Sequence, residues 1–315
     1  MLEVVESDGV STVQDMGRRG WRRFGVPASG PMDEFALLGA NLLAGNELGA
    51  AAIEVGAGDL SLEARQDAVI AVAGEGYELN VNIWKYPLWG SYFVRRGWVI
   101  HLQKRERGMW AYLAVSGGIE TAPVLGSRAT YLRGRFGGLQ GRPLQAGDEL
   151  HVGVSPHGLI ELAGRTIIES CRPVYESAPF VDVIKGPQQA NLTARSLQTF
   201  FSASYRISRE ADRMGYRLEG PRLAHRTRPD LISEGIAPGC IQVPADGSPI
   251  VMMADSATTG GYPKIGCVIR ADQPKLAQCR PGKDDVRFRE TTLDAAQRKY
   301  REQADRLRRG IREAD

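Results

Sequence analysis

Cysteine and histidine are scarce in this chain, with four of each among 315 residues. The cysteines show none of the close pairs that a zinc site uses, and we expect no metal site. All four lie in the second half of the chain, at Cys171, Cys240, Cys267 and Cys279. We expect them to be small buried or half-buried thiols in a reducing cytoplasm. A catalytic cysteine–histidine pair has no support from local spacing and would need the fold to bring its members together.

Long apolar stretches are also missing. No run approaches the roughly 18–20 residues needed to span a bilayer, so we expect no membrane partner. Residues 1–6 are acidic and strand-like, without the basic segment and apolar run of a signal peptide, so we expect a cytoplasmic protein. Lysine and arginine number 40 against 37 aspartate and glutamate residues, a formal net charge of +3. This near balance gives no reason to expect a nucleic-acid partner.

Several common catalytic motifs are absent. The chain has neither the GxxxxGK[ST] phosphate loop nor the GxGxxG nucleotide turn. The HExxH, paired CxxC and GxSxG signatures are missing as well. The chain therefore does not resemble a self-sufficient ATPase or a zinc enzyme.

Glycine and proline are abundant instead. They number 37 and 17, or 54 of 315 residues, which is about 17% against a usual ~12%. They are spread along the chain, a pattern typical of tight turns between short strands. The apolar runs between these turns predict strands at residues 1–14, 51–55, 69–73, 81–84, 92–94, 98–102, 111–115, 181–184, 204–207, 241–243, 250–254 and 265–269. This spacing favours a mostly β fold of sheets or barrels.

Three segments have helical periodicity. A helix is expected after Ser29, which would cap it, with Gly45 and Asn46 ending it. A short helix or helical turn is expected within residues 189–201. From residue 291 an apolar stripe, which runs as far as Ile311, predicts an amphipathic helix of about five turns.

The length suggests two domains, at roughly 100–200 residues per domain. The least patterned segment, residues 155–180, holds three prolines and is the best place for a boundary. We therefore expect β domains at residues 1–170 and 171–290 and a helical tail at 291–315. An arrangement with one domain inserted in the other fits the same sequence.

The densest group of candidate functional residues follows the expected strand at 250–254. Asp255, at a strand end, can act as a general base or orient one. Lys264 can supply positive charge for an anionic ligand. The residues between them combine hydroxyls with backbone N–H groups in a tight turn that favours anions: Thr258, Thr259, Gly260 and Gly261. An ordinary Gly-Gly turn, with its hydroxyls bonded to local backbone, fits the same residues.

Arginine-rich loops are the other candidates. Arg213 lies in the charged segment 208–217, while Arg18 and Arg22 follow Asp15 in the glycine-rich loop 14–27. Clustered guanidinium groups can bind carboxylates or phosphates through paired hydrogen bonds. Solvated turns or an interface with another chain explain the same charges.

Many separate motifs agree with one family. They are TVQDMGR (12–18), FGVPASGPMD (24–33), AVSGGI (114–119), LGSR (125–128), FGGL (136–139), DRMGYRLEG (212–220), SEGI (233–236), IQVP (241–244) and TTGGYPKI (258–265). In this order they resemble the allophanate hydrolase subunit 2 family. That family includes KipA, the C subunit of bacterial 5-oxoprolinase and the matching part of the carboxyltransferase region of urea carboxylase. The resemblance extends over roughly residues 1–290.

The resemblance implies a fold of two cyclophilin-like β-barrel domains and at least one partner chain. Family members usually work with a KipI-like B subunit. In the 5-oxoprolinase version, the ATP-dependent opening of the lactam 5-oxoproline to glutamate also requires a third, A subunit. The complex would consume ATP, and no ATP site is evident in this chain.

The resemblance also suggests roles for individual residues. Asp255 and Lys264 are the expected catalytic residues, Asp255 positioning or deprotonating a nucleophile and Lys264 holding substrate charge. Substrate or anion binding is expected at Thr258, Thr259, Gly260, Gly261, Tyr262, Arg213 and Gln242. A loop or interface role is expected for Asp15, Arg18 and Arg22.

Two other functions stay open at this stage. As a carboxyltransferase component, the chain would accept carboxybiotin and an amide-like acceptor such as urea, with biotin arriving on another protein because the chain lacks the Met-Lys-Met attachment signal. As a KipA-type antagonist of a kinase inhibitor, it would need only a surface for its KipI-like partner.

Overall fold

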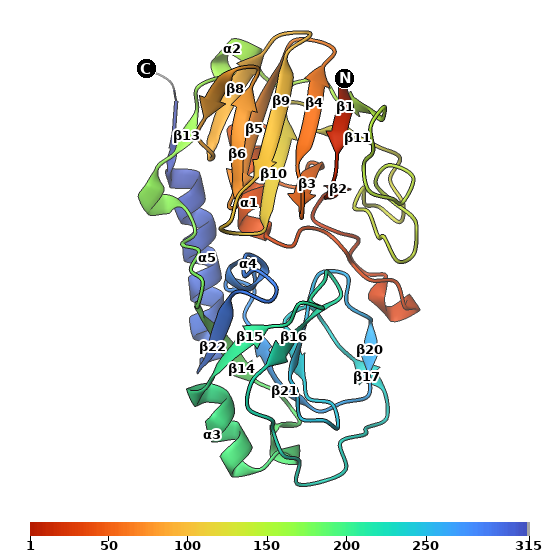
Figure 1. Ribbon diagram of the computed structural model, residues 1–315, viewed down its shortest axis with the longest axis vertical. Helices are drawn as coiled ribbons and strands as arrows, with labels where there is room; N and C mark the ends of the chain where they lie inside the picture. The colour runs from red at the N-terminus through yellow and green to blue at the C-terminus, as the bar shows by residue number, and fades with distance from the viewer. Residues whose placement is uncertain (314–315) are drawn as a thin grey trace. The chain divides into compact units, whose positions relative to one another are not determined.

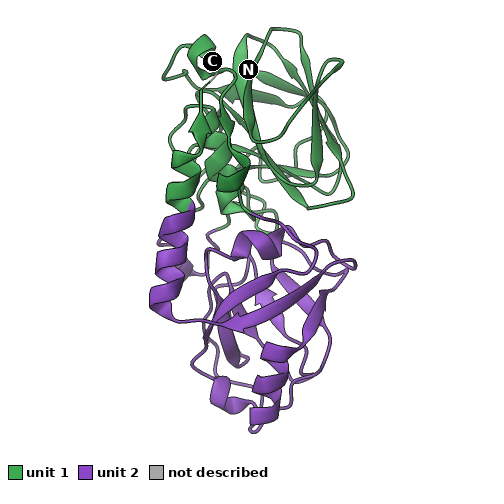
Figure 2. Cartoon of the chain, turned by 90° about the vertical axis from the view of Figure 1, so that its left-hand side faces the viewer, with its two compact units in different colours: residues 1–19, 29–173, 304–315 green, residues 20–28, 174–303 purple. Residues whose placement is uncertain are grey.

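The computed structural model describes residues 1–313. They divide into two compact units, each assembled from separate parts of the chain (Figure 2). Unit 1 comprises residues 1–19, 29–173 and those from 304 onward, and unit 2 comprises residues 20–28 and 174–303. The domains predicted at residues 1–170, 171–290 and 291–315 are continuous in sequence and stay a prediction. The prediction of a mostly β fold is confirmed (Figure 1).

Unit 1 consists mainly of short strands. Its strands are β1 (Leu2–Ser7), β2 (Val10–Gln14), β3 (Ala52–Gly56), β4 (Leu60–Ala64), β5 (Ala68–Gly74), β6 (Tyr77–Val81), β7 (Trp84–Tyr86), β8 (Gly90–Val94), β9 (Val99–Lys104), β10 (Trp110–Val115), β11 (Ile119–Glu120), β12 (Glu149–Val152), β13 (Thr166–Ile167) and β23 (Ile311–Arg312). Its helices are α1 (Glu34–Leu43) and α2 (Leu159–Leu162).

These strands form two seven-stranded sheets, ordered β11-β12-β1-β4-β9-β6-β7 and β2-β3-β10-β5-β8-β13-β23. The single strand predicted at residues 1–14 is therefore wrong, because the chain breaks at Gly9 and passes from the first sheet to the second. A Cβ on Gly9 would lie 2.5 Å from the Ala57 carbonyl oxygen, so only glycine fits this crossing. The strand predicted at 81–84 is also wrong, since these residues turn the chain between β6 and β7.

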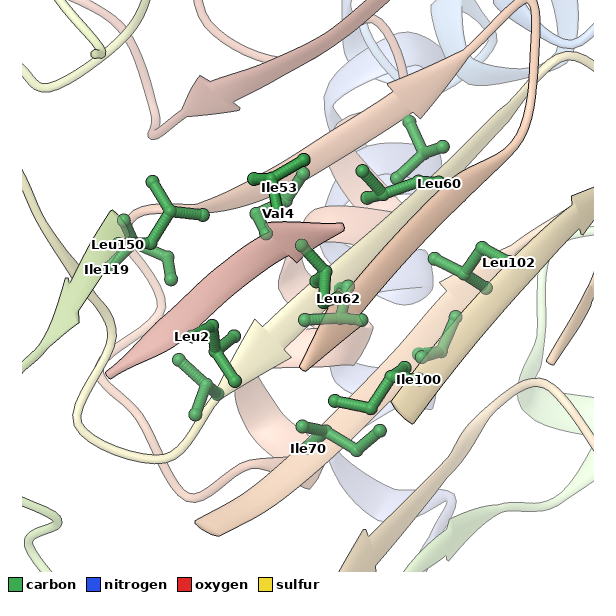
Figure 3. Packing of buried hydrophobic residues seen from close by; sticks show 14 of the residues in the cluster. Leu2, Val4, Ile53, Leu60, Leu62, Ile70, Ile100, Leu102, Ile119 and Leu150 are labelled. Atoms are coloured by element: carbon green, nitrogen blue, oxygen red, sulfur yellow. The ribbon is translucent and has the colours of Figure 1, made fainter. Parts of the chain in front are cut away.

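The core of unit 1 lies between the two sheets. Alternate residues of β1, β4 and β9 are fully buried and meet Ile53 of β3 and Ile70 of β5 from the other sheet (Figure 3). Strand alternation explains this arrangement, because every second side chain of a strand points to the same face.

Helix α1 begins later than the sequence suggested. Its N-cap is Asp33, whose carboxylate accepts a hydrogen bond from the backbone N–H of Ala36 at 3.0 Å. Ser29, the predicted cap, has a left-handed backbone (φ 54°) and lies before the helix. The predicted end is correct, since Gly45 follows the C-cap with φ 70°, a conformation that glycine adopts without strain.

Unit 2 contains a closed barrel. Its strands are β14 (Phe180–Lys185), β15 (Ser204–Ile207), β16 (Gly215–Glu219), β18 (Cys240–Gln242), β19 (Ile250–Met252), β21 (Lys264–Val268) and β22 (Asp285–Glu290), in the order β14-β21-β18-β19-β16-β15-β22. Parallel pairing of β14 with β22 closes the ring. A separate two-stranded sheet pairs β17 (Glu234–Gly235) with β20 (Thr259–Gly260).

Unit 2 also contains short helices. They are α3 (Ala194–Ser202), α4 (Gln273–Ala277) and the 3-10 turns η1 (Arg22–Phe24) and η3 (Gln189–Asn191); a further 3-10 turn, η2 (Glu169–Cys171), belongs to unit 1. Phe200 of α3 stacks on Phe288 of β22, with ring centroids 4.5 Å apart. The helix predicted within 189–201 is thus a 3-10 turn followed by α3.

The predicted C-terminal helix is confirmed as α5 (Leu293–Arg309). Its stripe residue Ala296 packs on Ile269 and Ala271 of unit 2. Ile311, predicted to continue the stripe, instead lies in β23 and pairs with Ile167 of β13. Within residues 1–313, none of the helices combines the length and the apolar character that crossing a membrane requires.

Candidate functional site

Two segments distant in sequence meet in the small sheet of unit 2. Glu234 of β17 pairs with Gly260 of β20, and Gly235 pairs with Thr259. On either side, Ile236 donates its backbone N–H to the Thr258 carbonyl at 3.0 Å, and residue 231 bonds residue 261 in the same way at 2.8 Å. The SEGI and TTGG motifs therefore form one small sheet. Within it, the Thr258 and Gly261 carbonyl groups of the predicted turn accept backbone hydrogen bonds.

Lys264 is the buried cation of this structure. It begins β21 and is 7% exposed, and its Nζ lies 3.0 Å from Oε1 of Glu234 and 3.3 Å from the Gly235 carbonyl oxygen. Gln188 holds the arrangement from one side: its Oε1 accepts from the Lys264 backbone N–H at 3.3 Å, and its Nε2 donates to Glu234. Because the Glu234 side chain is 43% exposed, the ion pair is buried at the lysine and open to solvent at the carboxylate.

Gln242 lies against the predicted glycine turn. Its side chain is buried, and Nε2 donates to the Tyr262 carbonyl at 3.3 Å. A Cβ on Gly260 would come within 2.4 Å of that Nε2, so glycine lets the turn approach the amide. Tyr262 is 39% exposed. Gln242, Gly260 and Tyr262 are thus brought together as the sequence suggested, while their role in binding stays a prediction.

Arg22 reaches the same segment from the loop at residues 20–28. Its Nη2 donates to the carbonyl of Ile236 and, at 3.0 Å, to that of Ala257. Nη1 is buried and has no hydrogen-bond partner among residues 1–313. Burial lowers the pKa of Arg22, against the attraction of nearby Cys240. Lys264 and Arg22 therefore bind consecutive carbonyls, at Gly235 and Ile236, and give this part of unit 2 two cations.

Asp255 and Arg213 form a separate buried pair. Arg213 Nε donates to Oδ2 of Asp255 at 2.8 Å and Nη2 donates to Oδ1 at 3.0 Å, with the two side chains 7% and 5% exposed. Both carboxylate oxygens are therefore occupied, and the arginine that was expected to hold substrate holds this aspartate. The predicted roles of the two residues stay predictions, and the geometry favours a positioning role.

Asp15 and Arg18 lie in unit 1. The Asp15 carboxylate accepts from Ser127 Oγ at 2.6 Å and from the Arg128 backbone N–H at 2.5 Å. Arg18 is 1% exposed; it donates to the Ala129 carbonyl, and its guanidinium lies 4.9 Å from the centroid of the Phe136 ring. Both residues organise the loop around residues 124–138, so the structure gives them loop contacts within the unit.

Sequence reasoning missed four members of this region. Gln188 lies in none of the motifs, and Glu234 appeared only within SEGI, without a proposed role. Cys240 and Cys267 were treated as unrelated thiols, yet they face each other on β18 and β21. Spacing in sequence could not reveal this pair, because strand register decides which residues are opposite.

In the described part of the chain no cluster of three or more histidine, cysteine, aspartate or glutamate residues is arranged to hold a metal ion.

The comparison with known families decides the assignment of the chain. The family model described as carboxyltransferase domain, subdomain A and B, matches residues 24–290. The chain belongs to this carboxyltransferase family. The matched span contains nearly every candidate residue of unit 2, from Gln188 to Lys264, whereas Asp15, Arg18 and Arg22 precede it.

Individual relatives of this carboxyltransferase-family chain carry two kinds of name. It is 37% identical over 303 residues to the 5-oxoprolinase C subunit of Escherichia coli (strain K12), covering 94% of this chain and 93% of that protein. It is 36% identical over 319 residues to the 5-oxoprolinase C subunit of Haemophilus influenzae, covering 99% of each. Among solved structures, the K. lactis urea amidolyase is similar, with a TM-score of 0.91 and 26% identity. That match covers 97% of this chain and 20% of the amidolyase, so this chain spans about a fifth of it.

Proposed function

We propose that this chain is the C subunit of an ATP-dependent 5-oxoprolinase, which opens the lactam of 5-oxoproline to glutamate together with a KipI-like B subunit and a separate A subunit. The observation that carries the proposal is end-to-end similarity: the two 5-oxoprolinase C subunits match at 36–37% identity, with at least 93% of both chains covered. Nearly the whole length of each 5-oxoprolinase C subunit is therefore matched by this chain.

The chemistry of ring opening suits the charges of unit 2. A lactam is a poor electrophile, and transfer of a phosphoryl group from ATP to its oxygen would activate the ring carbon for attack by water. Glutamate, ADP and inorganic phosphate are then the products. Every species on this route is an anion, because the substrate has a carboxylate and the activated form adds phosphate. Lys264 and the unpartnered Nη1 of Arg22 are the cations available in this region to bind such groups.

Within this proposal Lys264 exchanges partners. Glu234 neutralises the lysine before substrate binds, and its exposed carboxylate is free to move away when the substrate carboxylate or phosphate arrives. Gln242 and the glycine turn border the same segment and would hold the ring amide by hydrogen bonds. Asp255 acts through Arg213 by fixing the end of β19 to the start of β16. ATP and water enter as substrates of the whole complex.

The test is reconstitution from purified A, B and C subunits. We expect ATP-dependent release of glutamate from 5-oxoproline, and loss of that activity when this chain is left out. Binding of this chain to the B subunit is measured in parallel by gel filtration. An assembled complex of all three subunits that consumes no 5-oxoproline contradicts the proposal.

A second candidate is carboxyl transfer, favoured by the TM-score of 0.91 to the urea amidolyase over 97% of this chain. In that function carboxybiotin on a separate carrier and an amide-like acceptor would be the substrates. Labelled bicarbonate distinguishes the two functions: incorporation into urea or another amide, dependent on a biotin carrier, supports carboxyl transfer. Ring opening without any biotin protein supports the 5-oxoprolinase.

A further inference from the structure

Cys240 and Cys267 occupy directly opposite positions on neighbouring antiparallel strands. Register pairs Cys240 of β18 with Cys267 of β21, and the Val268 backbone N–H donates to the Gly239 carbonyl at 2.8 Å. This hydrogen bond flanks the two cysteines, so they form a non-hydrogen-bonded pair. Cα atoms in such pairs are about 4.5 Å apart and their side chains are close. Disulfides accept Cα separations of about 4.4–6.8 Å, so the backbone already has suitable spacing.

The two thiols lie on the same face of the sheet, because directly opposite residues of neighbouring strands point the same way. Both residues are half-buried and reduced, and the Cys267 Sγ donates to the Val268 carbonyl at 3.6 Å. Ile241, the next residue along β18, is fully buried in the barrel. Because successive side chains of a strand point to opposite faces, Cys240 lies on the other face, where a small reagent can reach it.

The surroundings of the two sulfurs differ. The adjacent Cys267 thiol lowers the pKa of the Cys240 thiol, as do the backbone at Ala237 and the charges of Lys264 and Arg22, against the effect of burial. The neighbouring Cys240 raises the pKa of the Cys267 thiol, and burial raises it further. Thiolates beside lysine or arginine are the reactive cysteines of proteins, whereas buried neutral thiols react slowly.

We propose that Cys240 and Cys267 are a redox-active dithiol for which a hydroperoxide is the oxidant, with Cys240 as the nucleophile and Cys267 as the resolving thiol. In the first step the Cys240 thiolate attacks a peroxide oxygen, a sulfur–oxygen bond forms, the oxygen–oxygen bond breaks, and the released hydroxide or alkoxide takes a proton. Cys267 then attacks the Cys240 sulfur, the disulfide forms, and the sulfur–oxygen bond breaks with loss of water that carries the Cys267 proton. The thiols lose two electrons and the peroxide gains them.

The remaining cysteines provide internal controls. Cys171, in unit 1, is also half-buried, and Cys279, in unit 2, is buried. Burial raises the pKa of Cys279. Neither is paired with another cysteine in the strand register of the described residues. The proposal therefore predicts selective oxidation at one pair within a chain of four thiols.

The experiment maps disulfides in the full-length protein. The reduced protein is exposed to hydrogen peroxide, remaining thiols are blocked with iodoacetamide, and the denatured protein is digested with trypsin without reduction. Cleavage after Lys264 separates the two cysteines into peptides 227–264 and 265–270. We expect these peptides to be joined, and dithiothreitol to separate them. Without peroxide, iodoacetamide at pH 7 should modify Cys240 at least tenfold faster than Cys171.

Single variants separate the two roles. In Cys267→Ser we expect a sulfenic acid on Cys240, trapped by dimedone, and in Cys240→Ser we expect Cys267 to stay reduced. Cys171→Ser should oxidise like the wild type. Oxidation of Cys171 or Cys279 as fast as Cys240, or wild-type oxidation without the joined peptides, overturns the proposal. The wild-type map decides the matter even where a variant folds poorly, and it needs no ring-opening assay, so it is independent of the proposed function.

Discussion

Arg213 and Asp255 are joined by two parallel hydrogen bonds in the interior of unit 2, Nε to Oδ2 at 2.8 Å and Nη2 to Oδ1 at 3.0 Å. A backbone hydrogen bond also joins the two residues, since the Asp255 N–H donates to the Arg213 carbonyl at 2.8 Å. The pair ties the loop before β16 to the loop after β19. The aspartate predicted as a general base therefore has both carboxylate oxygens bound to a buried arginine, and its catalytic role stays a prediction.

Removing one member of this pair should destabilise unit 2. Asp255→Ala leaves a buried guanidinium without its carboxylate, and we expect the free energy of unfolding to fall by about 3 kcal/mol, the usual cost of breaking a buried ion pair. Hydrogen exchange of β16 and β19 measures this locally. The control is Glu210→Ala, which removes an exposed partner of Arg217 and should change little. Equal exchange rates in Asp255→Ala and wild type would show that the pair contributes no stability.

Lys264 should matter for activity more than for stability. In the reconstituted complex, Lys264→Met removes the cation proposed to bind the substrate anion, and we expect kcat/KM to fall at least a hundredfold, about 2.7 kcal/mol of transition-state stabilisation. Binding to the B subunit should be retained. The matched control is Lys185→Met on the adjacent strand β14, because Lys185 forms a surface ion pair with Glu290. Full activity of Lys264→Met would show that Lys264 does not bind the substrate.

Gly260 and Gly235 offer a paired test of the turn, since they lie on the two strands of the small sheet. An alanine Cβ at position 260 would lie 2.4 Å from Gln242 Nε2, whereas one at position 235 meets no atom within 4 Å. Gly260→Ala should displace the Gln242 amide and break its hydrogen bond to Tyr262, at a cost of about 1 kcal/mol. We expect KM for the substrate to rise severalfold in Gly260→Ala and to stay unchanged in Gly235→Ala. The same KM for both variants would exclude Gln242 from substrate binding.

Lys299 of α5 should stabilise unit 2 in a pH-dependent way. Its Nζ lies 2.7 Å from both Asp182 Oδ2 and Asp272 Oδ2. Burial opposes ionisation of Asp182, but hydrogen bonds from Arg289 and Lys299 outweigh it and lower the pKa of Asp182 below its ordinary value.

A lowered pKa in the folded state stabilises the protein above the unfolded pKa of about 3.9, and this contribution is lost as the pH falls through the folded pKa. Lys299→Met should therefore cost about 2 kcal/mol at pH 7 and much less at pH 2–3. Scanning calorimetry at several pH values measures the difference. Arg308→Ala, which breaks an exposed pair with Asp305, is the control. A cost that does not change with pH would contradict the assigned ion pairs.

The strands of this protein were largely visible in its sequence because their apolar runs are short and bounded by glycine or proline. β15 matches its predicted residues, and β3, β5, β10 and β14 differ by only a residue or two at their ends. β22 was missed, since charged residues alternate with Val286 and Phe288 and hide the buried face. β4 was missed because Ser61 and Glu63 alternate with Leu60 and Leu62 and interrupt the apolar run.

The candidate site was only partly predictable. The TTGG turn and Lys264 were identified because consecutive glycines and hydroxyls beside a lysine are unusual enough to notice, and Gln242 was identified through the family resemblance. Their partners were not, since Gln188 and Glu234 lie far from Lys264 in sequence and reach it only through the small sheet and the barrel. The ion pair of Asp255 with Arg213 could not be predicted, because a sequence cannot show which carboxylates have a buried counter-ion; the catalytic role of Asp255 stays a prediction.

The sequence by itself determined the mostly β class, the positions of most strands, the C-terminal helix and the family, because local patterns and ordered motifs carry that information. Tertiary structure decided which charges are paired and which thiols are opposite. Arg213 holds Asp255, Glu234 faces Lys264, and Cys240 meets Cys267. These relationships depend on strand register and closure of the barrel, which bring together residues between 27 and 42 positions apart in the chain. The scarcity of cysteine thus proved compatible with a close pair of thiols beside two cations.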